Sequence, residues 1–149
     1  MFSKILFPTD FSDASKKALE YIGRLKSAGA KEVVVLHVID DRDVTTMFGG
    51  DAVAPLPVAQ VEKIMGAMEQ TAVEESKTVE AGLREAGFQV SVRLERGIPS
   101  REILRVEEKE SVSIIILGSH GKSLVKEMLL GSVSEEIVRK CRAPVLVIK

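Results

Sequence analysis

The stretch EVVVLHVI at residues 32–39 decides the fold. It is a continuous run of mostly β-branched and aliphatic residues, and such a run suits a strand that is covered on both faces. The run VSIIIL at residues 112–117 has the same character. Strands buried on both faces occur almost only in parallel sheets that carry helices on either side. These two runs therefore predict an α/β protein with a parallel sheet at its centre.

Further strands alternate with helices along the chain. The segment FQVSVRLE at residues 88–95 alternates in polarity, so we expect its strand nearer a sheet edge. One helix is long and amphipathic, with an irregularity expected at Gly66. The predicted strands are residues 5–7, 32–39, 88–95, 112–117 and 144–148. The predicted helices are residues 14–28, 58–86 and 133–141, together with a short one that opens at the turn 97–100 and ends at 110. This alternation implies a doubly wound, open parallel sheet with helices on both faces.

Length and composition restrict the class of protein. The 149 residues fit a single domain, which we place at residues 1–149. The net charge of -1 gives no basic footprint for nucleic acid, and the aliphatic runs are too short to span a bilayer. The lone Cys141 cannot form an intrachain disulfide, which suits a reducing cytoplasm. We therefore expect a cytoplasmic protein that binds neither nucleic acid nor membranes.

The candidate binding residues follow two of the predicted strands. In an open parallel sheet, ligands bind outside the carboxyl ends of the strands, where the strand order reverses. The first strand ends in Pro8, Thr9 and Asp10, and the fourth ends in GSHG at residues 118–121. If these strands are neighbours at the reversal, the two loops face each other across a crevice.

Three glycines mark a candidate phosphate site. Gly118 and Gly121 let a loop turn tightly and let backbone amides approach a ligand closely. Gly131 precedes a predicted helix, whose unpaired N–H groups and positive dipole end favour an anion. These N–H groups belong to Ser132, Val133 and Ser134, and the two serine hydroxyls can add donors.

Each piece also has an interpretation that needs no ligand. Ser132 and Glu135 fit the capping box S-x-x-E, and Gly118 could be a plain turn after a strand. Asp10 could cap the following helix, and His120 could be an exposed turn residue. His37 is interpreted as a packed structural histidine, and Cys141 as a small core residue.

One nearby pattern is misleading. The residues Gly121-Lys122-Ser123 look like the end of a Walker A loop, G-x-x-x-x-G-K-[ST]. That motif requires glycine at position 116, which is Ile116 inside an apolar strand. We therefore interpret Lys122 as a solvated side chain rather than a phosphate ligand.

The wider spacing resembles a known family. G-x2-G-x9-G-[ST] after the fourth strand, here Gly118, Gly121 and Gly131-Ser132, is similar to the signature of the ATP-binding universal stress proteins. The resemblance extends over the whole chain. It includes ILFPTDFSDAS at residues 5–15, LHV at 36–38, GIP at 97–99 and CRAPVLVIK at 141–149.

The resemblance implies a fold and a ligand. The fold is a five-stranded parallel sheet of order 3-2-1-4-5, of the adenine nucleotide alpha hydrolase-like type. The ligand is ATP, or ADP or AMP, with Mg²⁺ or Mn²⁺ as counter-ion to the phosphates. Asp10 would lie near the ribose and phosphates, and Val38 would meet the adenine. The binding residues implied are Pro8, Thr9, Asp10, Val38, Gly118, His120, Gly121, Gly131, Ser132, Val133 and Ser134.

The resemblance also implies a homodimer. The last strand, PVLVI from Pro144 to Ile148, ends the chain and would form a sheet edge. An exposed apolar edge strand invites pairing with a second chain. We therefore predict a homodimer joined through this strand.

The expected function is that of a nucleotide-dependent switch or sensor in the stress response. A slow or partner-stimulated ATP hydrolase is the first alternative. Only Asp10 and His120 are candidates to position a water, and no arginine finger or catalytic glutamate can be assigned. A dimeric interaction module without nucleotide is the second alternative. The sequence identifies no protein partner.

Overall fold

The computed structural model describes residues 1–40, 42–43, 56–121 and 130–149. Most of the predicted loop from Asp40 to Pro57 and the predicted solvation of Lys122 fall outside the described residues. The described elements are β1 (Lys4–Pro8), α1 (Asp13–Leu25), β2 (Glu32–Ile39), α3 (Val58–Glu85), β3 (Gln89–Arg96), α4 (Pro99–Glu110), β4 (Ile114–Gly118), α5 (Ser132–Lys140) and β5 (Val145–Ile148). The predicted alternation of strands and helices is confirmed, with no end shifted by more than three residues.

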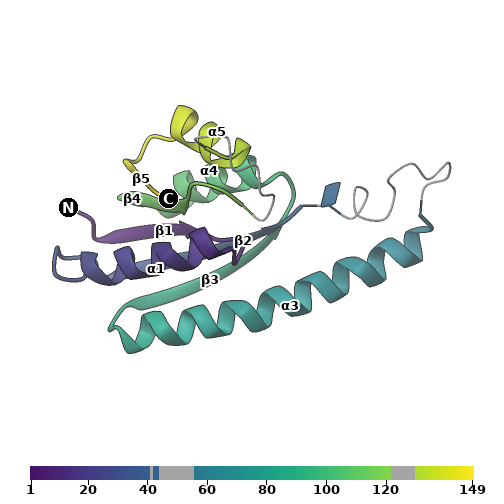
Figure 1. Cartoon of the computed structure of the whole chain (residues 1–149), viewed down its shortest axis with the longest axis horizontal. Coiled ribbons are helices and arrows are strands. Elements are labelled where there is room, and N and C mark those ends of the chain that lie inside the picture. The colour runs from purple at the N-terminus through teal and green to yellow at the C-terminus, as the bar shows by residue number, and fades with distance from the viewer. Residues whose placement is uncertain (41, 44–55, 122–129) are drawn as a thin grey trace.

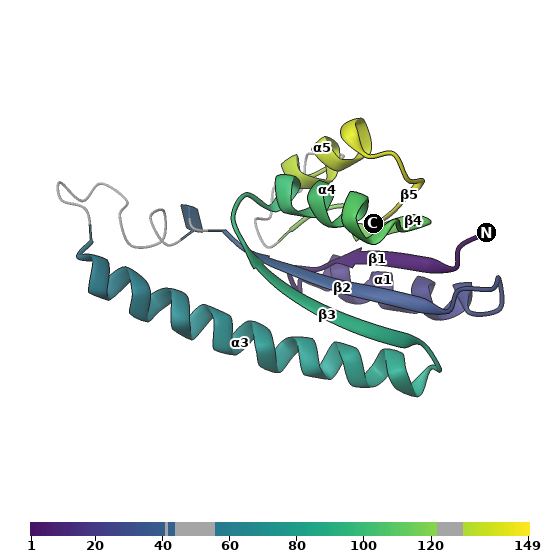
Figure 2. The same cartoon turned by 180° about the vertical axis from the view of Figure 1, so that it is seen from behind.

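The strands form one parallel sheet of order β3-β2-β1-β4-β5, as predicted. β1 lies at the centre, where Leu6 is opposite Val34 of β2 on one side and Ile115 of β4 on the other. β3 and β5 are the edge strands, which confirms the expectation for both. Helices α1 and α3 cover one face of the sheet, and α4 and α5 cover the other (Figures 1 and 2).

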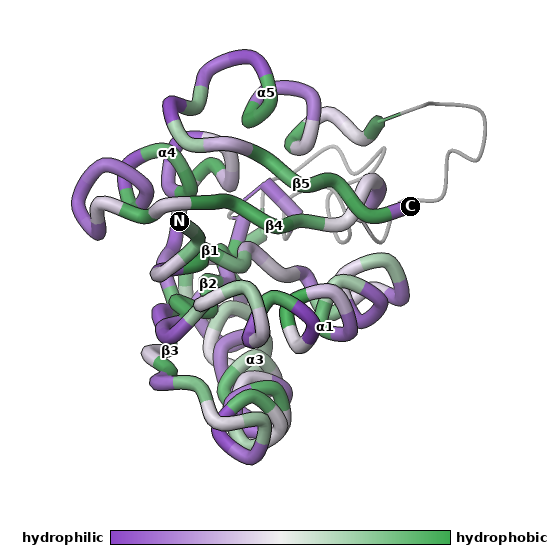
Figure 3. The backbone as a smooth tube through the Cα atoms, turned by 90° about the vertical axis from the view of Figure 1, so that its left-hand side faces the viewer, coloured by the Kyte–Doolittle hydropathy of each residue, from purple (hydrophilic) through white to green (hydrophobic). Residues whose placement is uncertain are grey.

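The core explains why EVVVLHVI carries no polar alternation. Successive side chains of a strand point to opposite faces. Val33 and Val35 therefore pack under α1 and α3, while Val34 and Leu36 pack under α4 and α5. All four of these valine and leucine side chains are buried. Figure 3 shows the apolar strands enclosed between helices whose outer turns are hydrophilic.

Helix α3 is continuous over 28 residues and passes through Gly66 without a break. The expected irregularity at Gly66 is therefore wrong. A glycine in a helix interior costs only about 1 kcal/mol relative to alanine, and packing of the residues Met65, Ala72, Ser76 and Leu83 in the interior offsets it. Among the described residues, no helix combines the length and the apolar character needed to cross a membrane.

Ion pairs join the centre of the sheet to its β3 side through α4. The carboxylate of Glu110 at the end of α4 accepts from Lys4 Nζ of β1 at 2.8 Å and from Arg93 Nη1 of β3 at 2.6 Å. Arg93 also contacts Glu95, which in turn pairs with Arg105. The hydrogen bond and charge of Lys4, with those of Arg93, hold the pKa of Glu110 below its ordinary value of 4.5.

This lowered pKa predicts a pH-dependent contribution to stability. A carboxyl group whose pKa is lower in the folded state stabilises the fold above its unfolded pKa, and the stabilisation is lost as pH falls through the folded pKa. Glu110→Gln should therefore lower the free energy of unfolding at pH 7 by about 1 kcal/mol, as partly exposed pairs do. As the pH falls through the lowered folded-state pKa of Glu110, the variant and the wild type should converge, because the wild-type carboxyl group is then protonated.

Urea unfolding at pH 7 and pH 3 measures the effect, provided that both proteins are folded at the lower pH. Glu108→Gln is the matched control, since Glu108 is exposed and its contact with Arg142 is longer, at 3.4 Å. An equal difference between Glu110→Gln and wild type at both pH values would rule out the ion pairs as the cause.

Candidate functional site

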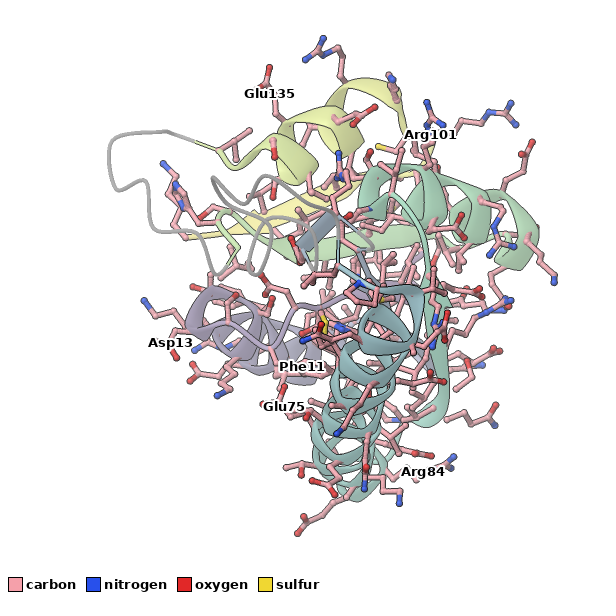
Figure 4. The ribbon with its side chains drawn as sticks, turned by 90° about the vertical axis from the view of Figure 1, so that its right-hand side faces the viewer. Phe11, Asp13, Glu75, Arg84, Arg101 and Glu135 are labelled. Atoms are coloured by element: carbon pink, nitrogen blue, oxygen red, sulfur yellow. The ribbon has the colours of Figure 1, made fainter. Side chains whose placement is uncertain are left out.

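The candidate site lies where β1 and β4 end side by side. Ile5 and Leu6 of β1 are paired with Ile114 and Ile115 of β4, so the strand order reverses between these two strands. The loops that follow them meet. A Cβ built on Gly121 would lie only 2.8 Å from Asp10 Oδ2. The predicted adjacency of the two loops is confirmed. Figure 4 looks at this end of the sheet.

Asp10 connects the site to the start of α1. Its Oδ1 accepts from the Ser12 backbone N–H and from the Ser15 hydroxyl, each at 3.0 Å. The cap of α1 is Ser12, whose hydroxyl accepts from Ser15 N. Asp10 is therefore not the helix cap; it braces the capping turn through one oxygen while its other oxygen lies against Gly121. No sequence pattern pointed to Ser15 as a partner of this carboxylate.

Thr9 and Pro8 form the floor of the loop after β1. Pro8 is the last residue of β1, opposite Leu36. Thr9 is buried, donates its N–H to Leu36 O at 2.9 Å, and accepts from Phe11 N on its hydroxyl at 3.0 Å. Val38 lies half-buried near the end of β2, on the face covered by α4 and α5. The N–H and the hydroxyl of Thr9 are thus both used within the protein, to β2 and to the loop.

The three signature glycines have three different neighbours. A Cβ on Gly118 would lie 2.9 Å from Ala14 Cβ and 3.0 Å from Ser15 N, because the first turn of α1 packs directly on the end of β4. Gly121 borders Asp10. Gly131 donates its N–H to Ser119 O at 2.7 Å, which brings the start of α5 onto the GSHG loop. The structure therefore gathers all three glycines at one end of the sheet.

Among the described residues, no side chain caps the start of helix α5. Its N-cap is Gly131, with extended backbone angles, and its first backbone bond runs from Glu135 N to Gly131 O at 2.9 Å. Ser132 is already the first helical residue, so the alternative interpretation of Ser132 and Glu135 as a capping box is wrong. The physical reason is that a capping serine must keep extended angles, and Gly131 takes that position instead.

The two glutamates near the start of α5 form ion pairs with basic residues of the same helix. Glu135 pairs with Arg139 at 2.9 Å and points outward from the helix (Figure 4). Glu136 pairs with Lys140 at 2.7 Å. The N–H groups of Ser132, Val133 and Ser134 precede the first helical bond. The positive end of the helix dipole thus faces the GSHG loop without a capping side chain.

The serine hydroxyls near the glycines divide into two kinds. Ser134 is buried and donates to Gly118 O at 2.8 Å, which anchors α5 to the end of β4. Ser119 is buried, and its hydroxyl lies 2.8 Å from His120 Nδ1. Ser132 is exposed. The hydroxyl proton of Ser134, expected as a donor to a ligand, is used within the protein, and the role of Ser119 was not predicted.

The chemistry of this end of the sheet suits an anion joined to a hydroxyl-bearing group. Backbone N–H groups at a helix start attract phosphate or sulfate. A carboxylate such as Asp10 accepts from hydroxyl groups or contacts a cation. Among the described residues, no group of three or more His, Cys, Asp or Glu side chains gathers to hold a metal ion.

Comparison with known proteins places the chain in a family. The universal stress protein family matches residues 1–149. The chain belongs to the universal stress protein family. The universal stress protein MJ0577 of Methanocaldococcus jannaschii is 39% identical over 155 residues, covering 100% of this chain and 96% of that protein. The universal stress protein YxiE of Bacillus subtilis is 32% identical over 149 residues, covering all of both chains.

The fold agrees with the same family. The solved structure of MJ0577 has a TM-score of 0.88 to this chain at 38% identity, and covers 100% of this chain and 96% of its own. A universal stress protein structure from Lactobacillus plantarum reaches a TM-score of 0.83 at 20% identity, which shows the fold alone. The resemblance stated from the glycine spacing is therefore confirmed at the level of family and fold.

The different neighbours of the glycines predict different costs for adding a methyl group. Gly118→Ala should destabilise the fold by about 1–3 kcal/mol, because the new Cβ meets backbone atoms of α1 that cannot move alone. Gly131→Ala is the control, since its Cβ would make only ordinary contact at 3.4 Å and its φ of -70° suits alanine. Thermal unfolding of both variants checks this. Equal melting temperatures would show that α1 does not constrain Gly118.

Proposed function

We propose that this universal stress protein binds ATP, or ADP or AMP, and acts in the stress response as a nucleotide-dependent switch. The observation that carries the proposal is the meeting of three features at the reversal of strand order. These are the Asp10 carboxylate, the GSHG loop at 118–121 and the start of α5, which no side chain of the described residues caps. We further propose that the chain works as one cytoplasmic domain.

The phosphates would lie on the start of α5. The N–H groups of Ser132, Val133 and Ser134 precede the first helical bond, and the helix dipole adds a partial positive charge. Gly121 and His120 border this start through the contacts of Gly131. Ser134 would contribute its backbone N–H, since its hydroxyl donates to Gly118 O.

The nucleoside would lie toward β1 and β2. Asp10 offers a carboxylate oxygen on the Gly121 side, which suits the hydroxyls of a ribose. Pro8 and Thr9 form the adjoining floor, and Val38 supplies an apolar surface for a base. Two solved universal stress proteins that share this fold support the ligand class. One is described in complex with cAMP, and one from Arabidopsis thaliana is described with AMP bound, at TM-scores of 0.60 and 0.64.

A divalent ion would find one carboxylate ligand in this arrangement. Mg²⁺ is usually held by one or two carboxylates together with phosphate oxygens and water. Asp10 is the carboxylate that lies against the GSHG loop, so it could supply one ligand to Mg²⁺ or Mn²⁺. The ion would neutralise phosphate charge, while the α5 amides and Asp10 would fix the orientation of the nucleotide.

The geometry favours holding the nucleotide over cleaving it. Hydrolysis needs a positioned water and further stabilisation of charge on the leaving phosphate. Asp10 Oδ1 already accepts hydrogen bonds from the Ser12 N–H and the Ser15 hydroxyl, so this oxygen is engaged at the start of α1. The Nδ1 of His120 lies within hydrogen-bond distance of Ser119. A switch that binds ATP with slow or partner-stimulated turnover is therefore the function that we propose.

Calorimetric titration with ATP and Mg²⁺ tests the proposal. Gly121→Ala should weaken binding about tenfold or more, because its Cβ would displace the Asp10 carboxylate. Gly66→Ala on α3 is the matched control, since a Cβ at this position would meet no atom within 4 Å and Gly66 is not a residue of the candidate site. A wild-type protein that binds no adenine nucleotide would refute the proposal. Rapid multiple turnover of ATP by the purified wild type would instead show that the protein is a hydrolase and not a switch.

We also propose that two copies pair through β5. Among the described strands, β5 pairs only with β4, so its outer edge is open to a second strand. An apolar groove runs beside this edge, between β5 and α5, and is lined by Leu130, Val138, Cys141, Ala143, Val145, Val147 and Lys149. A second edge strand and its neighbouring side chains would cover this surface.

A buried carboxylate of α4 fixes the backbone that leads into β5. Glu107 of α4 accepts from Arg142 N at 2.8 Å and from Ala143 N at 2.7 Å, just before β5 begins. Burial, together with the charge of Glu107, raises the pKa of the Cys141 thiol. Cys141 was interpreted as a small core residue; it is half-buried and packs against the core under α4 and α5 from its edge.

Sedimentation velocity at micromolar concentration checks the dimer. The wild type should sediment as a dimer, and Val147→Arg should sediment as a monomer, since a charge in the groove resists burial. Val58→Arg is the control, because Val58 is an exposed apolar residue at the start of α3, a helix that packs on β2 and β3. A monomeric wild type would rule out the proposed interface.

A further inference from the structure

The loop after β1 has a backbone conformation that its sequence does not favour. Phe11 has φ of 61°, in the left-handed region, where bulky residues are rare. Its side chain is nevertheless buried, with 7% exposed. Such a residue persists only where the surroundings hold it, and these positions concentrate around ligand sites.

The side chain that holds this loop is His37 of β2. Its Nδ1 lies 2.8 Å from the carbonyl oxygen of Thr9. A carbonyl can only accept, so Nδ1 carries the hydrogen and donates it. The imidazole also packs on Phe11, with ring centroids 4.8 Å apart and planes tilted by 31°. One side chain thus fixes both neighbours of Asp10.

Packing alone does not require a histidine here. By strand alternation, His37 shares the face of Val33 and Val35, which are apolar and buried. An aliphatic or phenyl side chain would fill the same space but would leave the Thr9 carbonyl without this donor. Because Thr9 is 7% exposed, loss of that bond would leave a buried acceptor poorly satisfied.

We propose that His37 is a positioning residue for the nucleotide site. By fixing Thr9 through Nδ1 and Phe11 through its ring, it aims the Asp10 carboxylate at the Gly121 side of the crevice. His37 acts from beneath the loop, through the backbone on either side of Asp10. The inference deepens the proposed function and rests on it, since the effect on affinity requires that the site bind a nucleotide.

Two substitutions separate the donor from the ring. His37→Asn keeps an N–H donor at the δ position and loses the ring, whereas His37→Phe keeps a ring against Phe11 and loses the donor. If the bond to Thr9 aims Asp10, His37→Phe should weaken ATP binding about tenfold, and His37→Asn should stay within about threefold of wild type. Calorimetric titration with ATP and Mg²⁺ measures both.

A stability control separates positioning from general loss of packing. Val33→Ala removes buried methyl groups from the amino end of the same strand, far from the loop. It should lower the melting temperature at least as much as His37→Phe and leave ATP affinity unchanged. If affinity fell in step with melting temperature across all three variants, or if His37→Phe bound ATP like wild type, the inference would be overturned.

A measurement without nucleotide keeps this inference distinct from the proposed function. Long-range ¹H–¹⁵N NMR spectra of the imidazole nitrogens should show a hydrogen on Nδ1 of His37. The amide resonances of Thr9, Asp10 and Phe11 should shift in His37→Phe and much less in Val33→Ala. A hydrogen on Nε2 with none on Nδ1 would overturn the positioning role even if ATP binds. If Nδ1 carries the hydrogen but the wild type binds no ATP, the loop geometry stands. The proposed function and the role of His37 in affinity would then both be overturned.

Discussion

The pairing of β1 with β4 is the contact on which the fold and the candidate site both depend. β2 and β3 extend the sheet from one side of β1, and β4 and β5 extend it from the other. Helix α1 follows β1 on one face of the sheet, and α5 follows β4 on the other. The loops after β1 and β4 therefore leave the sheet toward opposite faces. Their first residues stay close, which leaves an opening at the carboxyl ends. Asp10 and Gly121 meet in that opening.

The signature glycines follow from close packing around this opening rather than from unusual backbone angles. Positive φ among the described glycines occurs at Gly29, Gly87 and Gly97, all in turns before or after strands and none in the signature. Gly118 is required by the first turn of α1, and Gly121 by the Asp10 carboxylate. The glycine spacing that resembles a ligand motif is therefore also required by the close packing of α1, α5 and the loops after β1 and β4.

The fold could be predicted from local patterns, whereas the site could be predicted only in outline. Apolar runs and helical periodicity identify elements because they act over a few residues, and the strand order then followed from the family resemblance. The errors arose where a choice is nearly balanced or non-local. Ser132 had the chemistry of a cap, but Gly131 takes the extended angles. The role of His37 depends on Thr9, 28 positions away in sequence, and no spacing rule reveals such a contact.

The connections of the site give the proposed switch a physical route. Asp10 is bonded to the start of α1 on one face of the sheet, and Ser134 bonds the start of α5 to β4 on the other. A nucleotide held by Asp10 and by the α5 amides would therefore act on both helix starts at once. Val138 and Cys141, at the far end of α5, line the groove beside β5. A shift of α5 along its axis would change the surface offered to a second copy, so ligand state and pairing would be coupled through one short helix.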